Sequence, residues 1–287
     1  MKDHIIVCPF DEQLLAKLSE RNVVIKSHDL NILQSIQKHL NKSLRLHAIK
    51  IQTDVPLSAI SFQEDWLKLP LAIYSPEFGN YRDLLHQLNL IRRLNIRIFL
   101  SSEYDDNYTG LKILSSLNIN CGLYFNNGSI NWEAMNDLMH YAVYSKTKHA
   151  HIEPFDWLVS NYEPTDYMDY HSVYFNNPAK YLHVNEKEQI ALNEQEMLNN
   201  RIIGDGIPSL DRIHVNEHYN DFINARYDIM LQMNECAYCP AFRICLAKFE
   251  HLTNKNDTCK VFFSDFINAA DYSFKQRNSK RTKIWQL

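Results

Sequence analysis

Short β-branched runs alternate with longer amphipathic runs through the first half of this chain. The candidate strands are residues 4–8, 22–26, 44–51, 71–74, 96–100, 120–125 and 149–152. The helix-like segments between them are residues 11–19, 30–40, 81–94, 111–117 and 132–144, with Ser129 and Asn131 as candidate N-caps for the last. A repeat of about 25 residues per βα step predicts an α/β fold with a mainly parallel sheet. The periodicity alone leaves an open sheet and a partial barrel both possible.

The alternation weakens after Pro154, which divides the chain. Residues 155–200 are rich in Tyr, Asp, Glu and Asn, and we expect a helix over residues 186–198. A turn cluster follows at residues 204–208, with the sequence Gly-Asp-Gly-Ile-Pro. We therefore expect an α/β region over 1–155, a connecting segment over 156–200 and a C-terminal domain over 201–287.

The composition excludes several classes of protein. The formal net charge of −4 argues against a strongly basic nucleic-acid binder. No run approaches the roughly 18 apolar residues of a membrane span, and the N-terminus lacks the apolar core of a signal peptide. No glycine precedes Gly79, which excludes a glycine-rich phosphate loop in the first quarter. We expect a cytoplasmic protein, in which clustered cysteines indicate metal or redox chemistry.

Four of the 6 cysteines lie close together near the C-terminus. Cys236, Cys239, Cys245 and Cys259 have the spacing C-x2-C-x5-C-x13-C, and a proline follows the second cysteine. Four thiolates satisfy either a tetrahedral zinc ion or a [4Fe–4S] cluster, and the spacing alone does not choose between them. The alternative is a set of buried free cysteines or a redox disulfide. The pattern favours a metal centre, with Arg243 and Lys248 close enough in sequence to offset part of the thiolate charge.

This C-x2-C-x5-C spacing with a later cysteine resembles the C-terminal SPASM domain of radical SAM enzymes that modify ribosomal peptides. In that family these positions bind an auxiliary [4Fe–4S] cluster, so the resemblance implies Cys236, Cys239, Cys245 and Cys259 as its ligands. The βα pattern over residues 71–155 is similar to the later steps of the radical SAM barrel, and the whole resemblance covers roughly residues 65–265. The implied fold is a partial (β/α) barrel with a small SPASM-like cysteine domain.

One departure from the family decides the expected function. Radical SAM chemistry needs a C-x3-C-x2-C motif near the N-terminus, and Cys8 is the only cysteine in the first 120 residues. SAM is therefore not expected as a cofactor, and the chain resembles a degenerate, pseudo-radical-SAM member. We expect a non-catalytic iron–sulfur accessory protein that binds a precursor peptide, an active radical SAM enzyme, or both.

Two other interpretations remain open at this point. C-x2-C-x5-C also resembles the cluster motif of Cas4-like and AddB-like nucleases, in which a distant upstream cysteine, here Cys8, is the fourth ligand. Such nucleases need an Asp followed by Glu-x-Lys, which we cannot place in this acidic chain. The third interpretation is an α/β binding protein stabilised by a Zn2+ ion.

A weaker metal site is suggested by the sequence His149-Ala-His151-Ile-Glu153. Alternate residues of a strand point to one face, so His149, His151 and Glu153 would lie together. The simpler interpretation, which we favour, is a polar strand edge with hydrogen-bonded histidines. Elsewhere, Cys8 and Cys121 are expected to be small core residues. The tyrosines at positions 162, 167, 170 and 174 are candidates for a peptide groove or for an ordinary amphipathic surface.

Overall fold

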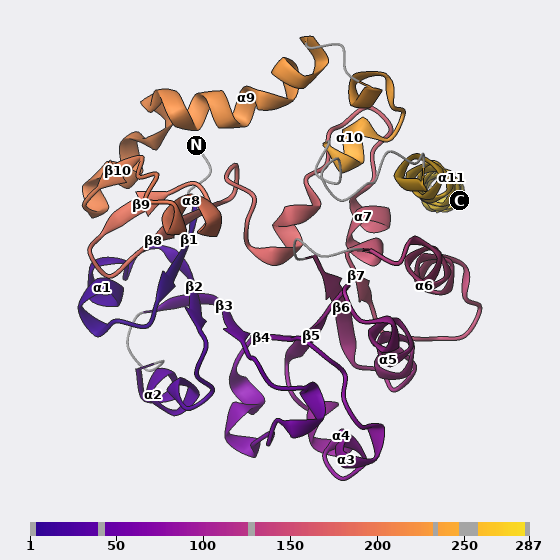
Figure 1. Ribbon diagram of the computed structural model, residues 1–287, viewed down its shortest axis with the longest axis horizontal. Coiled ribbons are helices and arrows are strands. Elements are labelled where there is room, and N and C mark those ends of the chain that lie inside the picture. The colour runs from indigo at the N-terminus through magenta and orange to yellow at the C-terminus, as the bar shows by residue number, and fades with distance from the viewer. Residues whose placement is uncertain (1–3, 40–43, 126–129, 232–234, 247–257, 285–287) are drawn as a thin grey trace. The chain divides into compact units, whose positions relative to one another are not determined.

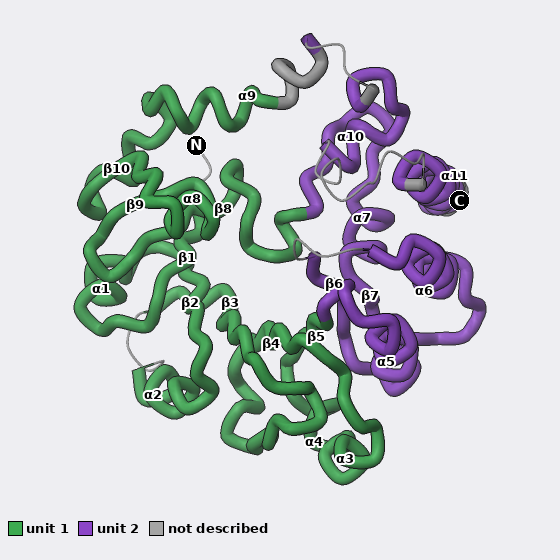
Figure 2. The backbone as a smooth tube through the Cα atoms, in the orientation of Figure 1, with its two compact units in different colours: residues 1–100, 171–225 green, residues 101–170, 226–287 purple. Residues whose placement is uncertain are grey.

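The computed structural model describes residues 4–39, 44–125, 130–231, 235–246 and 258–284, and these form an α/β fold. The chain divides into two compact units (Figure 2). Unit 1 comprises residues 1–100 and 171–225, and unit 2 comprises residues 101–170 and 226–287. The boundaries expected near residues 155 and 200 fall inside unit 2 and unit 1, respectively.

Unit 1 is built on a mostly parallel, open sheet with the strand order β10-β9-β8-β1-β2-β3-β4-β5. Its strands are β1 (Ile5–Pro9), β2 (Asn22–Ser27), β3 (Arg45–Gln52), β4 (Leu71–Ser75), β5 (Ile96–Ser101), β8 (Tyr181–Val184), β9 (Gln189–Ala191) and β10 (Gly204–Asp205). β1 pairs in parallel with both β2 and β8, whereas β9 pairs antiparallel with β8 and β10. β1 and β4 are largely apolar and buried, as expected for parallel strands with both faces covered. β3 is more polar and is buried only in part.

Helices of unit 1 follow the strands in chain order. They are α1 (Glu12–Lys17), α2 (Ile32–His39), α3 (Tyr81–Leu85), α4 (Leu88–Ile91), α8 (Glu194–Leu198) and α9 (Glu217–Leu231), with 3₁₀ helices η1 (Leu57–Ala59), η2 (Glu64–Lys68), η3 (Tyr170–Tyr174) and η4 (Ile207–Val215). Figure 1 shows α1, α2, α3 and α4 on the same side of the strands β1 to β5. Right-handed crossovers place successive helices on one side when the strand order does not reverse. Asp11 caps α1 by accepting the N–H of Leu14 at 2.7 Å.

Unit 2 contains the short parallel pair β6 (Asn120–Tyr124) and β7 (Ile152–Glu153). Its helices are α5 (Asp105–Ser116), α6 (Trp132–Tyr144), α7 (Phe155–Asn161), α10 (Phe242–Cys245) and α11 (Thr258–Ile284), with the 3₁₀ helix η5 (Glu235–Tyr238). Of the two N-cap candidates, Asn131 caps α6, because its side chain accepts the N–H of Ala134 at 3.0 Å, and Ser129 lies outside the described residues. Within the described residues, no helix has both the length and the apolar character needed to cross a lipid bilayer.

Three expected secondary-structure segments differ in the structure. The segment expected as a helix over 186–198 contains a turn, the strand β9 and only the short helix α8. The side chain of Asn185 accepts the N–H groups of Lys187 and Gln189 at 3.0 and 2.9 Å, and this local bonding replaces the helical pattern. The helix expected over 81–94 is broken into α3 and α4, and the strand expected over 149–152 is reduced to Ile152–Glu153.

Candidate metal centre

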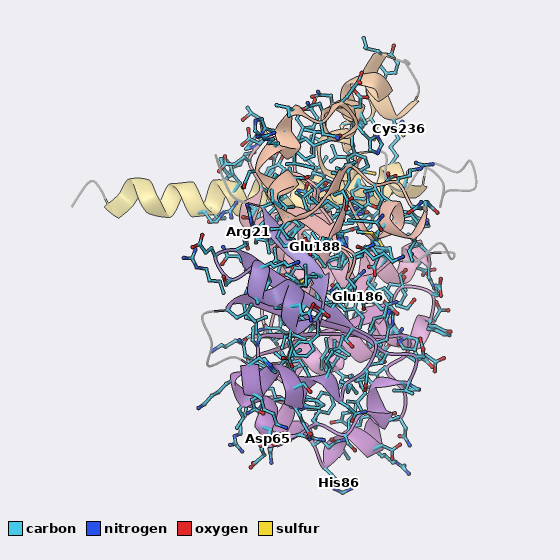
Figure 3. The ribbon with its side chains drawn as sticks, turned by 90° about the vertical axis from the view of Figure 1, so that its left-hand side faces the viewer. Arg21, Asp65, His86, Glu186, Glu188 and Cys236 are labelled. Atoms are coloured by element: carbon cyan, nitrogen blue, oxygen red, sulfur yellow. The ribbon has the colours of Figure 1, made fainter. Side chains whose placement is uncertain are left out.

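Cys236 and Cys239 lie on one tight turn at the start of the cysteine segment, which we define as residues 236–259. The carbonyl of Cys236 accepts the N–H of Cys239 at 3.1 Å, and the carbonyl of Cys239 accepts the N–H of Phe242 at 3.0 Å. Residues three apart in a 3₁₀ turn lie on the same side. These short-range backbone hydrogen bonds therefore favour an arrangement in which the thiols of Cys236 and Cys239 lie on the same side of the turn. Figure 3 labels Cys236.

Cys245 is the last residue of α10, a helix that is anchored by two of its own buried side chains. Phe242 is 5% exposed and Ile244 is fully buried. The next residue, Leu246, has a left-handed backbone with φ of 52°, a conformation that is costly for a residue with a branched side chain. This left-handed residue ends α10 directly after Cys245. Burial raises the pKa of Tyr170 well above its ordinary value, and the nearby Cys245 contributes to that increase.

Arg243 ties α10 to the segment that follows α7. Its carbonyl accepts the N–H of Met168 at 2.8 Å, and its guanidinium donates to the hydroxyl of Tyr162 and the carbonyl of Pro164. The same guanidinium lies 5.2 Å from the centre of the Tyr162 ring. Arg243 thus has a positioning role, in addition to any effect of its charge on the thiols. Lys248, the other expected cation, lies outside the described residues.

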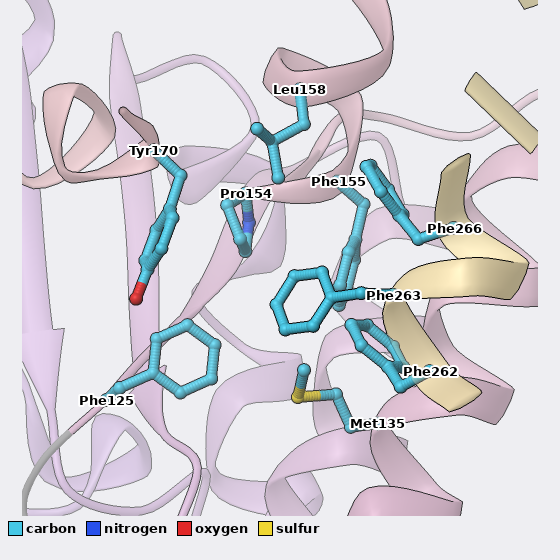
Figure 4. Close-up of a pocket in the computed structure, with 9 residues that line it drawn as sticks. All are labelled: Phe125, Met135, Pro154, Phe155, Leu158, Tyr170, Phe262, Phe263 and Phe266. Atoms are coloured by element: carbon cyan, nitrogen blue, oxygen red, sulfur yellow. The ribbon is translucent and has the colours of Figure 1, made fainter. Parts of the chain in front are cut away.

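Cys259 occupies the first turn of α11. The N–H groups at the start of a long helix have no intrahelical acceptor, and the helix dipole favours a negative charge there, such as a thiolate. Phe262, Phe263 and Phe266 hold the beginning of α11 in the core of unit 2, and they are 4%, 4% and 1% exposed. Figure 4 shows these three rings pointing toward Phe155 and Met135. The centres of the Phe155 and Phe262 rings are 6.3 Å apart.

All four cysteines of the segment are of intermediate exposure. Four thiols are the donor set that zinc and iron–sulfur clusters take. In the part of the chain that the structure describes, no three Cys, His, Asp or Glu side chains lie close enough together to hold a metal ion. Residues 247–257, which separate Cys245 from Cys259, are not among those residues.

The structure places the side chains of His149, His151 and Glu153 against three different neighbours. His149 Nδ1 lies 3.2 Å from the Ser115 hydroxyl, and the centre of its ring lies 5.1 Å from that of Tyr141, with the two rings tilted by 31°. His151 Nδ1 lies 3.4 Å from an oxygen of Asp156. Glu153 accepts the N–H of Trp157 at 3.1 Å. A metal site at these three residues stays a prediction.

The remaining cysteines are core residues, as expected. Cys8 in β1 and Cys121 in β6 are 0% and 1% exposed. Burial raises the pKa of the Cys8 thiol to about 12, so this thiol is protonated at neutral pH. Tyr162 and Tyr170 are 1% and 3% exposed, so the expectation that both face a groove or an outer surface is wrong.

Sequence reasoning missed a polar cluster inside unit 1, made of Lys26, Lys50, His183 and Glu194. Its members come from β2, β3, β8 and α8, so no local motif marks it. Glu194 pairs with both lysines, at 3.3 Å for Lys26 and 3.0 Å for Lys50. The available signal was a lysine near the end of each of two strands, after the apolar run Val23–Ile25 in β2 and beside Ile49 and Ile51 in β3. We call these four residues the lysine cluster.

Comparison with protein-family models, with curated proteins and with solved structures gives no match to this chain. Evidence about function therefore comes from the cysteine segment and the lysine cluster.

Proposed function

We propose that Cys236, Cys239, Cys245 and Cys259 bind one [4Fe–4S] cluster in a non-catalytic accessory protein. The observation that carries this proposal is the spacing C-x2-C-x5-C-x13-C of four cysteines that all belong to unit 2. Two of them lie on one 3₁₀ turn, the third ends α10, and the fourth lies in the first turn of α11.

The cluster has a structural role in this proposal. The cysteine segment joins α10 to α11, and both helices have buried anchors, Phe242 and Phe266 among them. Because thiolate ligands reach a metal only when the chain between them is ordered, binding energy contributes directly to folding energy. A bound cluster would supply the cross-link that holds residues 236–259 in one arrangement.

The strand order of unit 1 supports the partial (β/α) barrel. β1 to β5 are neighbours in the order in which they occur in the chain, and β8 lies beside β1. A doubly wound sheet reverses its order near the first strand, whereas a (β/α) barrel does not. This strand order supports an architecture similar to that of the radical SAM barrel, and with it a SPASM-like role for the cysteine segment.

The connection after β1 supports a role without SAM cleavage. Only Phe10 and Asp11 separate β1 from α1, and neither can ligate a cluster iron through sulfur. We propose that the protein acts in the cytoplasm on ribosomal peptide modification. It would bind the precursor peptide, an active radical SAM enzyme, or both, while its partner performs the radical chemistry.

Metal and sulfide analysis of anaerobically purified full-length protein tests the cluster. We expect iron and acid-labile sulfide with broad absorption at about 400 nm, all lost in Cys245→Ser. Cys8→Ala is the matched control, and it should keep the cluster, whereas a nuclease-type centre would lose it. If the protein contains zinc and no sulfide, the four cysteines form a zinc site and the proposed [4Fe–4S] cluster is wrong. Cleavage of SAM by the protein under reducing conditions would overturn the non-catalytic role.

A further inference from the structure

The lysine cluster of unit 1 is assembled across adjacent strands. Lys26 on β2 and Lys50 on β3 are direct partners in the parallel ladder, so their side chains leave the sheet on the same face. Glu194, the first residue of α8, lies between their ammonium groups, 3.3 Å from Lys26 and 3.0 Å from Lys50. One carboxylate therefore bridges two cations, and the three side chains carry a net charge of about +1 at neutral pH.

These charges are largely removed from water. The side chains of Lys26, Lys50 and Glu194 are 28%, 13% and 30% exposed. Burial by itself would raise the pKa of Glu194, but Lys50 and Lys26 outweigh it and lower that pKa to about 2. Lys50 also lies 5.1 Å from the centre of the Tyr74 ring. The ring and the carboxylate hold the Lys50 ammonium in place.

His183 forms the floor beneath the two lysines. His183 on β8 and Val24 on β2 are both register partners of Val7, and Val24 is two residues before Lys26 on the same face. His183 is 2% exposed, and its Nε2 lies 3.3 Å from the carbonyl of Phe175, so Nε2 carries the proton. Nδ1 is then an acceptor, and among the described residues it has no hydrogen-bond partner.

A hollow of about 410 Å³ opens above the cluster at the carboxyl ends of β1, β2 and β3. Lys26, Lys50 and Glu194 line it on one side, and Phe10 and Ile32 form an apolar part of its wall. A second hollow of about 360 Å³ shares Pro9, Lys26 and Glu186 with the first. Small-molecule sites of open α/β sheets lie at the carboxyl ends of the strands, and their volumes are about 300–1,000 Å³.

We propose that this β1–β3 hollow binds a small anionic molecule, whose phosphate or carboxylate group is held by Lys26 and Lys50. Each ammonium has three N–H donors. The bonds given by these lysines to the described residues all go to Glu194, so donors remain for a ligand. Glu194 orients both ammonium groups and cancels only one of their two charges.

The other charged groups at the hollow do not reverse this polarity. Glu186 lies on the turn after β8 and is exposed to solvent (Figure 3). The adjacent Lys187, also exposed, lines the neighbouring hollow with it. Solvent and salt screen these exposed charges more strongly than the half-buried lysine cluster. Phe10 and Ile32 provide an apolar contact for the uncharged part of the ligand.

The proposed anion site is independent of the proposed cluster, because it lies in unit 1 and uses no cysteine. The competing interpretation is that the lysines and Glu194 only stabilise the sheet. If Lys26, Lys50 and Glu194 only stabilise the sheet, an added anion should not bind saturably. If they form an anion site, an added anion should saturate it. The experiment therefore measures binding, and iron content is recorded in parallel.

The test is thermal unfolding and calorimetry of the full-length holoprotein with inorganic phosphate or succinate at constant ionic strength. We expect one anion to bind saturably and raise Tm with concentration. Lys26→Met and Lys50→Met should each weaken that binding by about tenfold or more, with unchanged iron content. Lys68→Met is the matched control, because Lys68 is an exposed lysine of unit 1 and removes the same charge. It should leave the affinity unchanged.

The outcome distinguishes the possible ligands. Saturation by phosphate alone assigns a phosphate site, and saturation by succinate alone assigns a carboxylate site. If neither anion saturates, or if Lys68→Met weakens binding as much as Lys50→Met, the proposal is wrong. If Lys50→Met fails to fold, Lys26→Met gives the same decision. Chemical-shift changes at the Ser27 and Gln52 amides should accompany binding, since both residues line the hollow.

Discussion

The cysteine segment and the lysine cluster obtain their chemistry from contacts of very different range in the chain. Cys236, Cys239 and Cys245 are placed by hydrogen bonds between residues three or four apart. Lys26 and Glu194, by contrast, are separated by 168 residues and meet only because β2 and α8 converge in unit 1. The cysteine segment is thus a local sequence motif that packs against a core. The lysine cluster is formed by residues that are distant in the chain and that the sheet brings together.

This difference predicts how each site responds to damage. In the proposed metal centre, the bound metal would order the cysteine motif, so removal of one ligand should abolish the site. A buried charge cluster is part of the folded core, so removal of one partner should lower the free energy of unfolding. The four predictions below, from the largest effect to the smallest, test that contrast.

The largest effect is expected for Cys245→Ser. Loss of one thiolate should remove all bound iron and sulfide, because structural metal sites contribute on the order of 10 kcal/mol to local folding. Hydrogen exchange should show faster exchange at residues 236–246 and 258–266 and no change at β1 to β5. A variant that retains iron would show that Cys245 is not a ligand, and Cys8→Ala provides the background level.

Glu194→Gln is expected to cost about 3 kcal/mol of unfolding free energy, because it leaves two half-buried ammonium groups without their carboxylate. Urea unfolding at pH 7 measures this difference. The wild-type contribution should be complete above pH 4.5 and be lost as the pH falls toward 2, because the pKa of Glu194 is lowered to about 2 in the folded state. Iron content should not change. A difference below about 0.5 kcal/mol would mean that the triad contributes little.

His183 should make unit 1 sensitive to mild acid. Burial, with smaller contributions from Lys26 and Lys50, lowers its pKa from 6.5 to about 3. Below pH 6.5, His183 binds a proton in the unfolded state but stays neutral in the folded state. The free energy of unfolding should therefore decrease as the pH is lowered from 6.5, by about 2 kcal/mol at pH 5. Glu194 stays ionised there and does not contribute.

His183→Gln tests this pH dependence, because glutamine keeps a donor for the Phe175 carbonyl but does not titrate. Urea unfolding between pH 7.5 and 5 should show a smaller slope for this variant than for wild type. His214→Gln, at an exposed position, is the control and should retain the wild-type slope. Equal slopes for all three proteins would contradict a buried neutral His183.

The smallest effect is expected for Glu64→Gln, which breaks an exposed ion pair of unit 1. Arg93 and Glu64 are 3.2 Å apart, but their side chains are 59% and 71% exposed. Solvent screening limits such pairs to less than about 1 kcal/mol. Urea unfolding should therefore separate Glu64→Gln clearly from Glu194→Gln. Similar losses in both variants would remove the distinction between the lysine cluster and an ordinary surface pair.

Much of the fold was predictable because its signal is local. The expected strands over residues 22–26, 71–74 and 96–100 each lie within an observed strand, extended by one residue in the structure. Apolar runs of this kind are buried on both faces in a parallel sheet, so they are easy to recognise. The helix expected over 186–198 failed because the turn bonding of Asn185 overrides helical periodicity.

The candidate metal centre was equally visible, because C-x2-C-x5-C is a spacing of neighbours in the chain. The structure added the physical context of each thiol: a 3₁₀ turn, the end of α10 and the start of α11. It also separated Cys8 and Cys121, which are buried in strands, from the four half-buried thiols. No spacing rule could have supplied the degree of burial.

By itself, the sequence determined the alternation of strands and helices, the positions of most parallel strands and the cysteine motif. All of these depend on residues close together in the chain. Only the tertiary structure decided that β8 returns to lie beside β1 and that α8 brings Glu194 to Lys26 and Lys50. The physical reason is that a half-buried charge is tolerable only next to its partner, and that partner is chosen by strand register and not by sequence distance.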